Sequence, residues 1–188
     1  MHSEGVAHGD IKGVSLRKSK STFCPLTCLY LKANILINQH ARACIADFGL
    51  AAIISDPACS TTLTSSANAG TIRWMSPERL DPAQFGIKDS RPTKGSDCYA
   101  LGMVILEVLS SEVPFAQDNN NFIVTNKVLK GEHPERPQGA RFTNDLWGTL
   151  QLCWSPQPNN RPTAEAVLRC LIRVSPPFME DGSLIDTQ

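Results

Sequence analysis

The run from Cys98 to Leu109 constrains the fold most, because it is apolar on nearly every face rather than along one stripe. About 18 to 20 apolar residues are needed to cross a bilayer, and this run is shorter. A helix that is apolar all round lies in the middle of a helical domain, with other helices packed around it. Ser96 and Asp97 are expected to supply its N-terminal cap and its first-turn negative charge, and Pro114 lies beyond its end.

The remaining pattern predicts strands early in the chain and helices late. Asn34–Ile37 and Ala43–Ala46 are short apolar runs separated by polar residues, which is typical of a small β-hairpin. Three further helices are expected, at about Asn121–Lys130, Asn144–Cys153 and Thr163–Val174. The predicted fold class is therefore mainly α with a small β-hairpin (α+β).

Composition limits the choice of partners and compartment. A chain of 188 residues suits one domain, and its 18 basic residues balance its 18 acidic ones, so neither a nucleic acid nor a membrane is expected as a partner. The seven cysteines form no Cys-x-x-Cys pair, and the first residues lack the basic-then-apolar pattern of a signal peptide. We expect reduced thiols in a cytoplasmic protein, with a nuclear location as the alternative.

Candidate chemistry lies beside the predicted hairpin. Asp10 and Lys12 precede its first strand, Asn34 begins that strand, and Asp47 follows its second strand. A hairpin brings both ends to one edge, where two carboxylates, an amide and an ammonium suit phosphoryl transfer with Mg²⁺. Each piece alone is weak evidence, since Asp47-Phe-Gly is also what a turn with a capping aspartate looks like.

Taken in order, these pieces resemble the C-terminal lobe of a eukaryotic protein kinase of the tyrosine-kinase-like Ser/Thr branch. The resemblance covers most of the chain. It rests on His8-Gly-Asp-Ile-Lys12, Asn34-Ile-Leu36, Asp47-Phe-Gly49, Gly70-Thr-Ile-Arg-Trp-Met-Ser-Pro-Glu78, Asp97 at the start of the apolar helix, and Cys153-Trp followed by Arg161-Pro.

The resemblance implies a role for each matching residue. Asp10 would accept the proton of the substrate hydroxyl, and Lys12 would contact the γ-phosphoryl of ATP. Asn34 and Asp47 would hold Mg²⁺, and Leu36 would form the floor of the adenine pocket. Lys12 favours Ser/Thr over Tyr as the acceptor in protein substrates.

Other matching residues receive binding or structural roles through the same resemblance. Thr71, in the activation segment, fits a Ser/Thr substrate preference. Glu78 and Arg161 would form a buried ion pair, and His8 would pack near Phe48 rather than bind a metal. Structural roles are thus implied for His8, Phe48, Gly49, Glu78, Asp97 and Arg161.

Two departures from the family pattern bear on activity. Gly9 stands where many kinases have the arginine that receives an activation-loop phosphate. The 188 residues contain no Gly-rich phosphate loop and no Val-Ala-x-Lys strand, so the N-lobe is absent. We expect a kinase fragment that is inactive by itself and exposes apolar surface on one side of the Cys98–Leu109 helix. The alternative is a pseudokinase or truncated kinase that acts as a protein-interaction module.

The third departure is a foreign insertion. The family has its asparagine five residues after the catalytic aspartate, whereas Asn34 follows Asp10 by 24. Removing Val14–Lys32 restores the spacing, and this segment has four basic residues and no acidic one. We interpret it as translated intron, with a genuine loop as the alternative. The expected domains are a partial kinase domain at 1–175 and a tail at 176–188.

Overall fold

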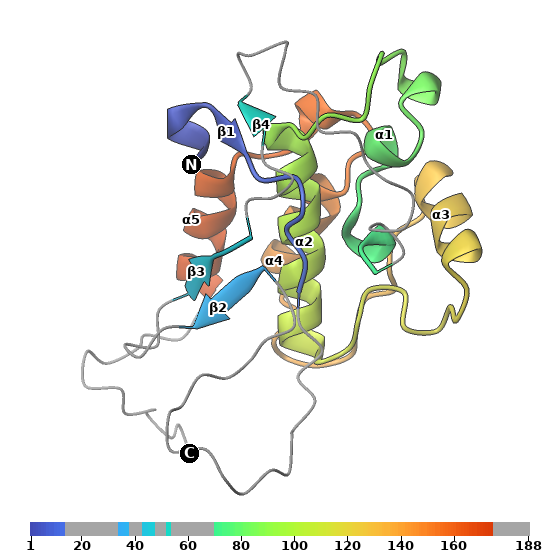
Figure 1. Ribbon diagram of the computed structural model, residues 1–188. Coiled ribbons are helices and arrows are strands. Elements are labelled where there is room, and N and C mark those ends of the chain that lie inside the picture. The colour runs from blue at the N-terminus through green and yellow to red at the C-terminus, as the bar shows by residue number, and fades with distance from the viewer. Residues whose placement is uncertain (14–33, 38–42, 48–51, 54–69, 175–188) are drawn as a thin grey trace, which may run out of the picture.

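The computed structural model describes residues 1–13, 34–37, 43–47, 52–53 and 70–174. Helix α2 (Lys94–Ser110) runs through the middle of these residues, with the other helices around it (Figure 1). Helix α4 (Asn144–Cys153) packs against α2 and against α5 (Ala164–Val174). Helices α1 (Pro77–Leu80) and α3 (Asn121–Leu129) contact each other on another side. The fold is mostly helical, as predicted, and α3, α4 and α5 match their expected ranges to within one residue.

The predicted hairpin is present. Strand β2 (Ile35–Ile37) pairs antiparallel with β3 (Ala43–Ile45), and Ile35 lies opposite Ile45. A second pair, β1 (Val6–Ala7) with β4 (Ala52–Ile53), has only two residues in each strand. Short 3-10 helices complete the described elements: η1 (His2–Glu4), η3 (Ile72–Trp74), η4 (Ala83–Phe85) and η5 (Pro158–Asn160).

Helix α2 begins earlier than its apolar pattern predicts, and its cap is a different residue. Thr93 has an extended backbone, and its hydroxyl accepts a hydrogen bond from the Ser96 backbone N–H at 3.0 Å. The Ser96 hydroxyl accepts in return from the Thr93 N–H at 2.8 Å. This reciprocal capping box corrects the expected cap, because Ser96 lies inside the first turn. The expected negative charge of Asp97 in the first turn is confirmed.

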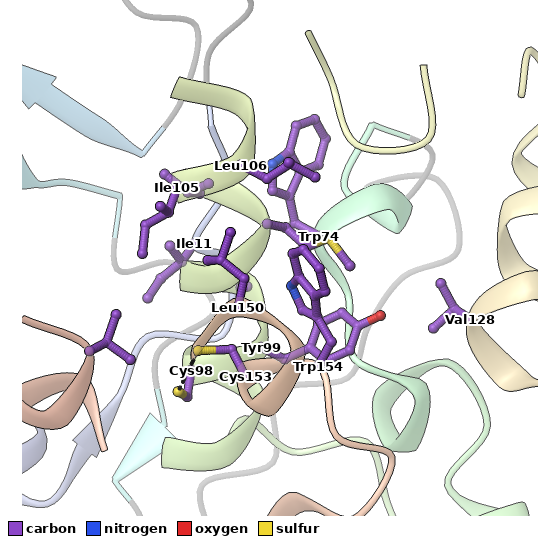
Figure 2. Close-up of a cluster of buried hydrophobic side chains, with 14 of the residues drawn as sticks. Ile11, Trp74, Cys98, Tyr99, Ile105, Leu106, Val128, Leu150, Cys153 and Trp154 are labelled. Carbon is purple, nitrogen blue, oxygen red and sulfur yellow. Dashed lines mark hydrogen bonds between the residues drawn. The ribbon is translucent and has the colours of Figure 1, made fainter. Parts of the chain in front are cut away.

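Core residues surround α2. The expectation that one side of the Cys98–Leu109 helix exposes apolar surface is therefore wrong. Eleven of the 17 residues of α2 are buried, and among its large apolar side chains Val108 is the exposed one. Figure 2 shows Tyr99 of α2 near Trp154, whose backbone follows α4. Elsewhere in the described residues, exposed apolar side chains lie outside α2: Ile45, Ile87, Phe122, Ile123, Leu152, Leu168 and Ile172. No helix of the described ranges is both long and apolar enough to span a membrane.

Candidate active site

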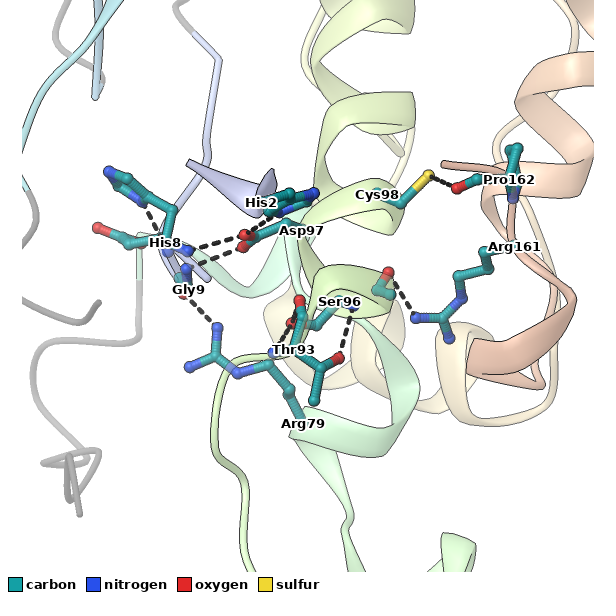
Figure 3. Close-up of polar contacts among 12 residues, drawn as sticks. His2, His8, Gly9, Arg79, Thr93, Ser96, Asp97, Cys98, Arg161 and Pro162 are labelled. Carbon is teal, nitrogen blue, oxygen red and sulfur yellow. Dashed lines mark hydrogen bonds and ion pairs between the residues drawn. The ribbon is translucent and has the colours of Figure 1, made fainter. Parts of the chain in front are cut away.

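The loop that carries Asp10 is fixed by the first turn of α2. Asp97, which is 2% exposed, accepts the His8 backbone N–H on Oδ2 at 2.7 Å and the Gly9 N–H on Oδ1 at 2.9 Å (Figure 3). Gly9 has a φ of 79°, a left-handed conformation that glycine adopts without steric cost. The buried carboxylate therefore holds the backbone N–H groups of the two residues that immediately precede Asp10.

A buried guanidinium holds the same loop from the opposite side. The Nη1 atom of Arg79 donates to the Gly9 carbonyl oxygen, and within the described residues its Nη2 has no hydrogen-bond partner. Burial lowers the pKa of Arg79, while the charges of Asp97 and Asp10 oppose that shift. Gly9 stands where many kinases have an arginine. The cation that contacts this loop comes instead from Arg79 of α1. No motif spacing pointed to Arg79.

His8 ties the loop to the hairpin. Its side chain is fully buried, and its Nε2 donates to the Ala46 carbonyl oxygen at 3.0 Å. Its Nδ1 accepts the Asp10 backbone N–H at 3.2 Å. One neutral tautomer, with the proton on Nε2, satisfies both bonds. His8 thus occupies a scaffold position, while its expected neighbours Phe48 and Gly49 lie outside the described residues.

Asp10, Lys12 and Asn34 converge although 24 residues separate the first from the last. Asn34 Nδ2 lies 2.6 Å from both the backbone oxygen and the Oδ2 of Asp10. Lys12 Nζ donates to the same Oδ2 at 2.9 Å. The other carboxylate oxygen, Oδ1, is buried and has no hydrogen-bond partner in the part of the chain that is described. The two carboxylate oxygens of Asp10 therefore differ. Oδ2 accepts hydrogen bonds from Lys12 and Asn34, whereas Oδ1 can still accept one.

The segment before α1 meets this cluster through Lys12. Lys12 Nζ also donates to Thr71 Oγ1 at 3.3 Å, and Thr71 is buried. Nearby, Arg73 anchors the segment by donating to the backbone oxygens of Pro114, at 2.8 Å, and Phe115, at 2.7 Å. Lys12 therefore bridges the Asp10 loop and the Thr71 segment.

Asn34 and Asp47 lie at one end of the hairpin and offer a donor set that fits Mg²⁺. The Ala46 N–H donates to the Asn34 backbone oxygen at 2.8 Å, and the exposed Asp47 follows with a φ of 61°. Since Asn34 uses Nδ2 toward Asp10, its Oδ1 is the atom suited to a cation, and Mg²⁺ prefers such oxygens together with phosphate and water. Among the described side chains, no group of three or more His, Cys, Asp or Glu residues could bind a metal ion. Leu36 lies in β2.

Glu78 and Arg161 form a buried ion pair away from Asp10. Arg161 Nη1 and Nη2 each lie 2.7 Å from one carboxylate oxygen of Glu78. The Arg161 side chain is 0% exposed and the Glu78 side chain is 3% exposed. Arg161 also donates to the backbone oxygens of Ser155 and Gly95 and lies 5.1 Å from the centre of the Tyr99 ring. This pair joins α1, the start of α2 and the segment before α5.

Comparison with known proteins places the chain in one family. Residues 31–171 match the model of the family described as protein tyrosine and serine/threonine kinase. Serine/threonine-protein kinase mos of Patiria pectinifera is 28% identical over 176 residues, which are 92% of this chain and 42% of that protein.

Two other relatives are serine/threonine kinases by name. Receptor-interacting serine/threonine-protein kinase 4 of Mus musculus is 35% identical over 148 residues, or 76% of this chain and 18% of that protein. Serine/threonine-protein kinase PknB of Mycolicibacterium smegmatis is 29% identical over 174 residues, or 92% of this chain and 24% of that protein. The chain spans less than half the length of each of these three relatives. These matches confirm the resemblance to Ser/Thr protein kinases and are consistent with the tyrosine-kinase-like branch.

Proposed function

The chain belongs to the protein tyrosine and serine/threonine kinase family, and we propose that its polar site transfers the γ-phosphoryl of ATP to Ser/Thr hydroxyls of protein substrates in an intact parent kinase. One observation carries the proposal. Asp10 Oδ2 is held by Lys12 and Asn34, while its buried Oδ1 has no hydrogen-bond partner among the described residues. A carboxylate arranged in this way is ready to accept a hydrogen bond from an incoming hydroxyl.

Each residue of the site then has one task. Asp10 orients the hydroxyl and takes its proton as the phosphoryl group arrives, and Lys12 neutralises the charge on that group. Asn34 and Asp47 would hold Mg²⁺, which would supply positive charge to stabilise the phosphates of ATP. Lys12, held between Asp10 and Thr71, supports a serine or threonine acceptor. Leu36 forms the floor of the adenine pocket.

We further propose that a polypeptide of only these 188 residues is inactive, because its sequence has no Gly-rich loop to cover the phosphates. The second candidate function is protein binding without catalysis. It is favoured by exposed apolar side chains on α3, where Phe122 is 70% exposed, and on α5, where Ile172 is 66% exposed.

Radiolabelled ATP with a generic protein substrate tests the proposal. The longest translation product that contains these residues should label serine and threonine, and the 188-residue polypeptide should label nothing. Label on tyrosine would refute the Ser/Thr assignment. Transfer by the 188-residue polypeptide that disappears in Asp10→Ala would refute its inactivity, and no transfer by a product that includes a Gly-rich loop would favour the binding module.

The segment Val14–Lys32 remains, in our proposal, translated intron. One fact supports this: Asp10 and Asn34 are in direct contact across the segment. Joining Gly13 to Ala33 would keep the reading frame and the family spacing. Sequencing the mature transcript decides the matter. Transcripts that retain the 19 codons would refute the intron and leave a basic loop beside the site.

A further inference from the structure

Two buried thiols face each other where α2 meets α4. Cys98 lies in the first half of α2, and Cys153 is the last residue of α4. Their sulfur atoms are 3.9 Å apart, and the residues are 2% and 0% exposed (Figure 2). Both are free thiols. A disulfide has an S–S distance of about 2.05 Å, so the sulfurs need to approach by about 2 Å.

The close approach of the two helices follows from a glycine one turn along α2. A Cβ placed on Gly102 would lie 2.8 Å from the Cβ of Cys153 and 2.8 Å from Nε1 of Trp154. The absence of a side chain at Gly102 therefore lets the end of α4 rest on the α2 backbone. Cys98, four residues earlier on the same face, then meets Cys153 side chain to side chain.

The surroundings make the two thiols chemically unequal. Cys98 Sγ donates to the Pro162 carbonyl oxygen at 2.8 Å (Figure 3). Interaction with the Cys153 thiol lowers the pKa of Cys98, and the positive charge of Arg161 acts in the same direction. The partner thiol and burial raise the pKa of Cys153. Cys98 is therefore the more readily ionised of the two, and thiolates are the form that oxidants attack.

A pocket lies beside the residue that contacts the Cys98 thiol. A pocket of about 550 Å³ is lined by Gly95, Arg161 and Pro162, together with residues of η1 and the start of α5. Pro162 is the residue whose carbonyl oxygen accepts the Cys98 thiol. The pocket therefore brings a small solute next to the residue that contacts the Cys98 thiol.

From this geometry we propose that Cys98 and Cys153 form a redox-sensitive dithiol, which a hydroperoxide converts into a disulfide between α2 and α4. The Cys98 thiolate attacks one peroxide oxygen, the O–O bond breaks, and Cys98 becomes a sulfenic acid while hydroxide leaves and is protonated. The Cys153 sulfur then attacks the Cys98 sulfur, the S–O bond breaks, and water leaves with the Cys153 proton. Overall, two thiols are oxidised and one hydrogen peroxide is reduced to two waters.

The disulfide would act on the candidate active site through the residue next to Cys98. Forming it draws Cys98 away from Pro162, and Asp97, the preceding residue, holds the N–H groups of His8 and Gly9. We expect the oxidised form to hold the Asp10 loop less well. This consequence rests on the proposed function, whereas the disulfide itself does not.

Peptide mapping of the folded protein after hydrogen peroxide treatment tests the proposal. Under non-reducing conditions, mass spectrometry should show the Cys98 peptide joined to the Cys153 peptide, and dithiothreitol should release them. Cys98→Ser and Cys153→Ser should each abolish this product, and Cys44→Ser, which changes an exposed thiol, should leave it unchanged. The wild-type map is decisive even if a variant fails to fold.

Several results would overturn the proposal. One is oxidation of Cys44 at peroxide doses that leave Cys98 and Cys153 as free thiols. Another is conversion of Cys98 to a sulfinic acid with no cross-linked peptide. A cross-link found only in urea-unfolded protein would also refute it. If the cross-link forms and phosphotransfer by the parent kinase is unchanged, the redox pair stands and its control of the active site is refuted.

Discussion

A buried carboxyl on α2 makes stability depend on pH. Glu107 is 1% exposed, its Oε2 accepts a hydrogen bond from Trp74 Nε1 at 3.0 Å, and its Oε1 has no hydrogen-bond partner within the described residues. Gly13 packs so closely that a Cβ there would lie 1.8 Å from Oε2. Burial raises the pKa of Glu107 from 4.5 to about 7, and the bond from Trp74 opposes the shift.

The sign and size of the effect follow from this pKa. The folded protein prefers the protonated carboxyl, so the free energy of unfolding is highest below the unfolded pKa of 4.5 and falls as the pH rises toward 7. Each pKa unit corresponds to about 1.4 kcal/mol, which gives a cost of about 3 kcal/mol at pH 8 and about 1 kcal/mol at pH 5. A neutral amide avoids this cost and can still accept the Trp74 N–H.

The variant Glu107→Gln should therefore be more stable than wild type by about 3 kcal/mol at pH 8 and by about 1 kcal/mol at pH 5. Urea unfolding followed by tryptophan fluorescence at both pH values measures the difference. Glu165→Gln, a change on the exposed surface of α5, serves as the control and should show almost no pH-dependent difference. An equal stability change at both pH values, or a loss of stability at pH 8, would refute the reasoning.

Substitutions at three further positions test the packing that supports the site, each by urea unfolding. Glu78→Gln should lower the unfolding free energy by about 3 to 5 kcal/mol, because it leaves the buried Arg161 charge uncompensated; a loss below about 1 kcal/mol would show that the pair is not structural. Thr93→Ala should cost about 1 kcal/mol and Thr93→Ser almost nothing, since only the hydroxyl caps α2; equal effects would contradict the capping box. Gly102→Ala should cost about 1 to 3 kcal/mol, because its new methyl group would press on Cys153 and Trp154, whereas a stabilised variant would contradict the close contact of α2 with α4.

The sequence predicted the helices well because their signals are local. The apolar run of α2 and the periodic patterns of α4 and α5 extend over several turns. Tertiary packing therefore did not change the secondary structure that these local patterns predict. The start of α2 was mispredicted because its first turn is polar and its cap, Thr93, precedes that turn. Strands β1 and β4 were missed because two residues are too few to show any alternation.

In the candidate site, the contact between two motif residues was predictable from the sequence, and the contacts that depend on how the elements pack were not. Asp10 and Asn34 were expected to meet, and their contact at 2.6 Å matches that expectation. The guanidinium of Arg79 and the pairing of Trp74 with Glu107 were not foreseen. The first depends on how α1 docks against the Gly9 loop and the second on how η3 docks against α2. Docking of this kind leaves no periodic pattern in the sequence.

The most direct test of the proposed active site is the turnover number for phosphotransfer in the parent kinase with Asp10→Asn. This change keeps the size of the side chain and removes its ability to accept a proton. We expect kcat to fall by about 10² to 10⁴-fold with little change in KM for ATP. The matched variant Asp89→Asn, which alters an exposed carboxylate paired with Arg91, should retain wild-type turnover. Undiminished turnover in Asp10→Asn would contradict the assignment of this site.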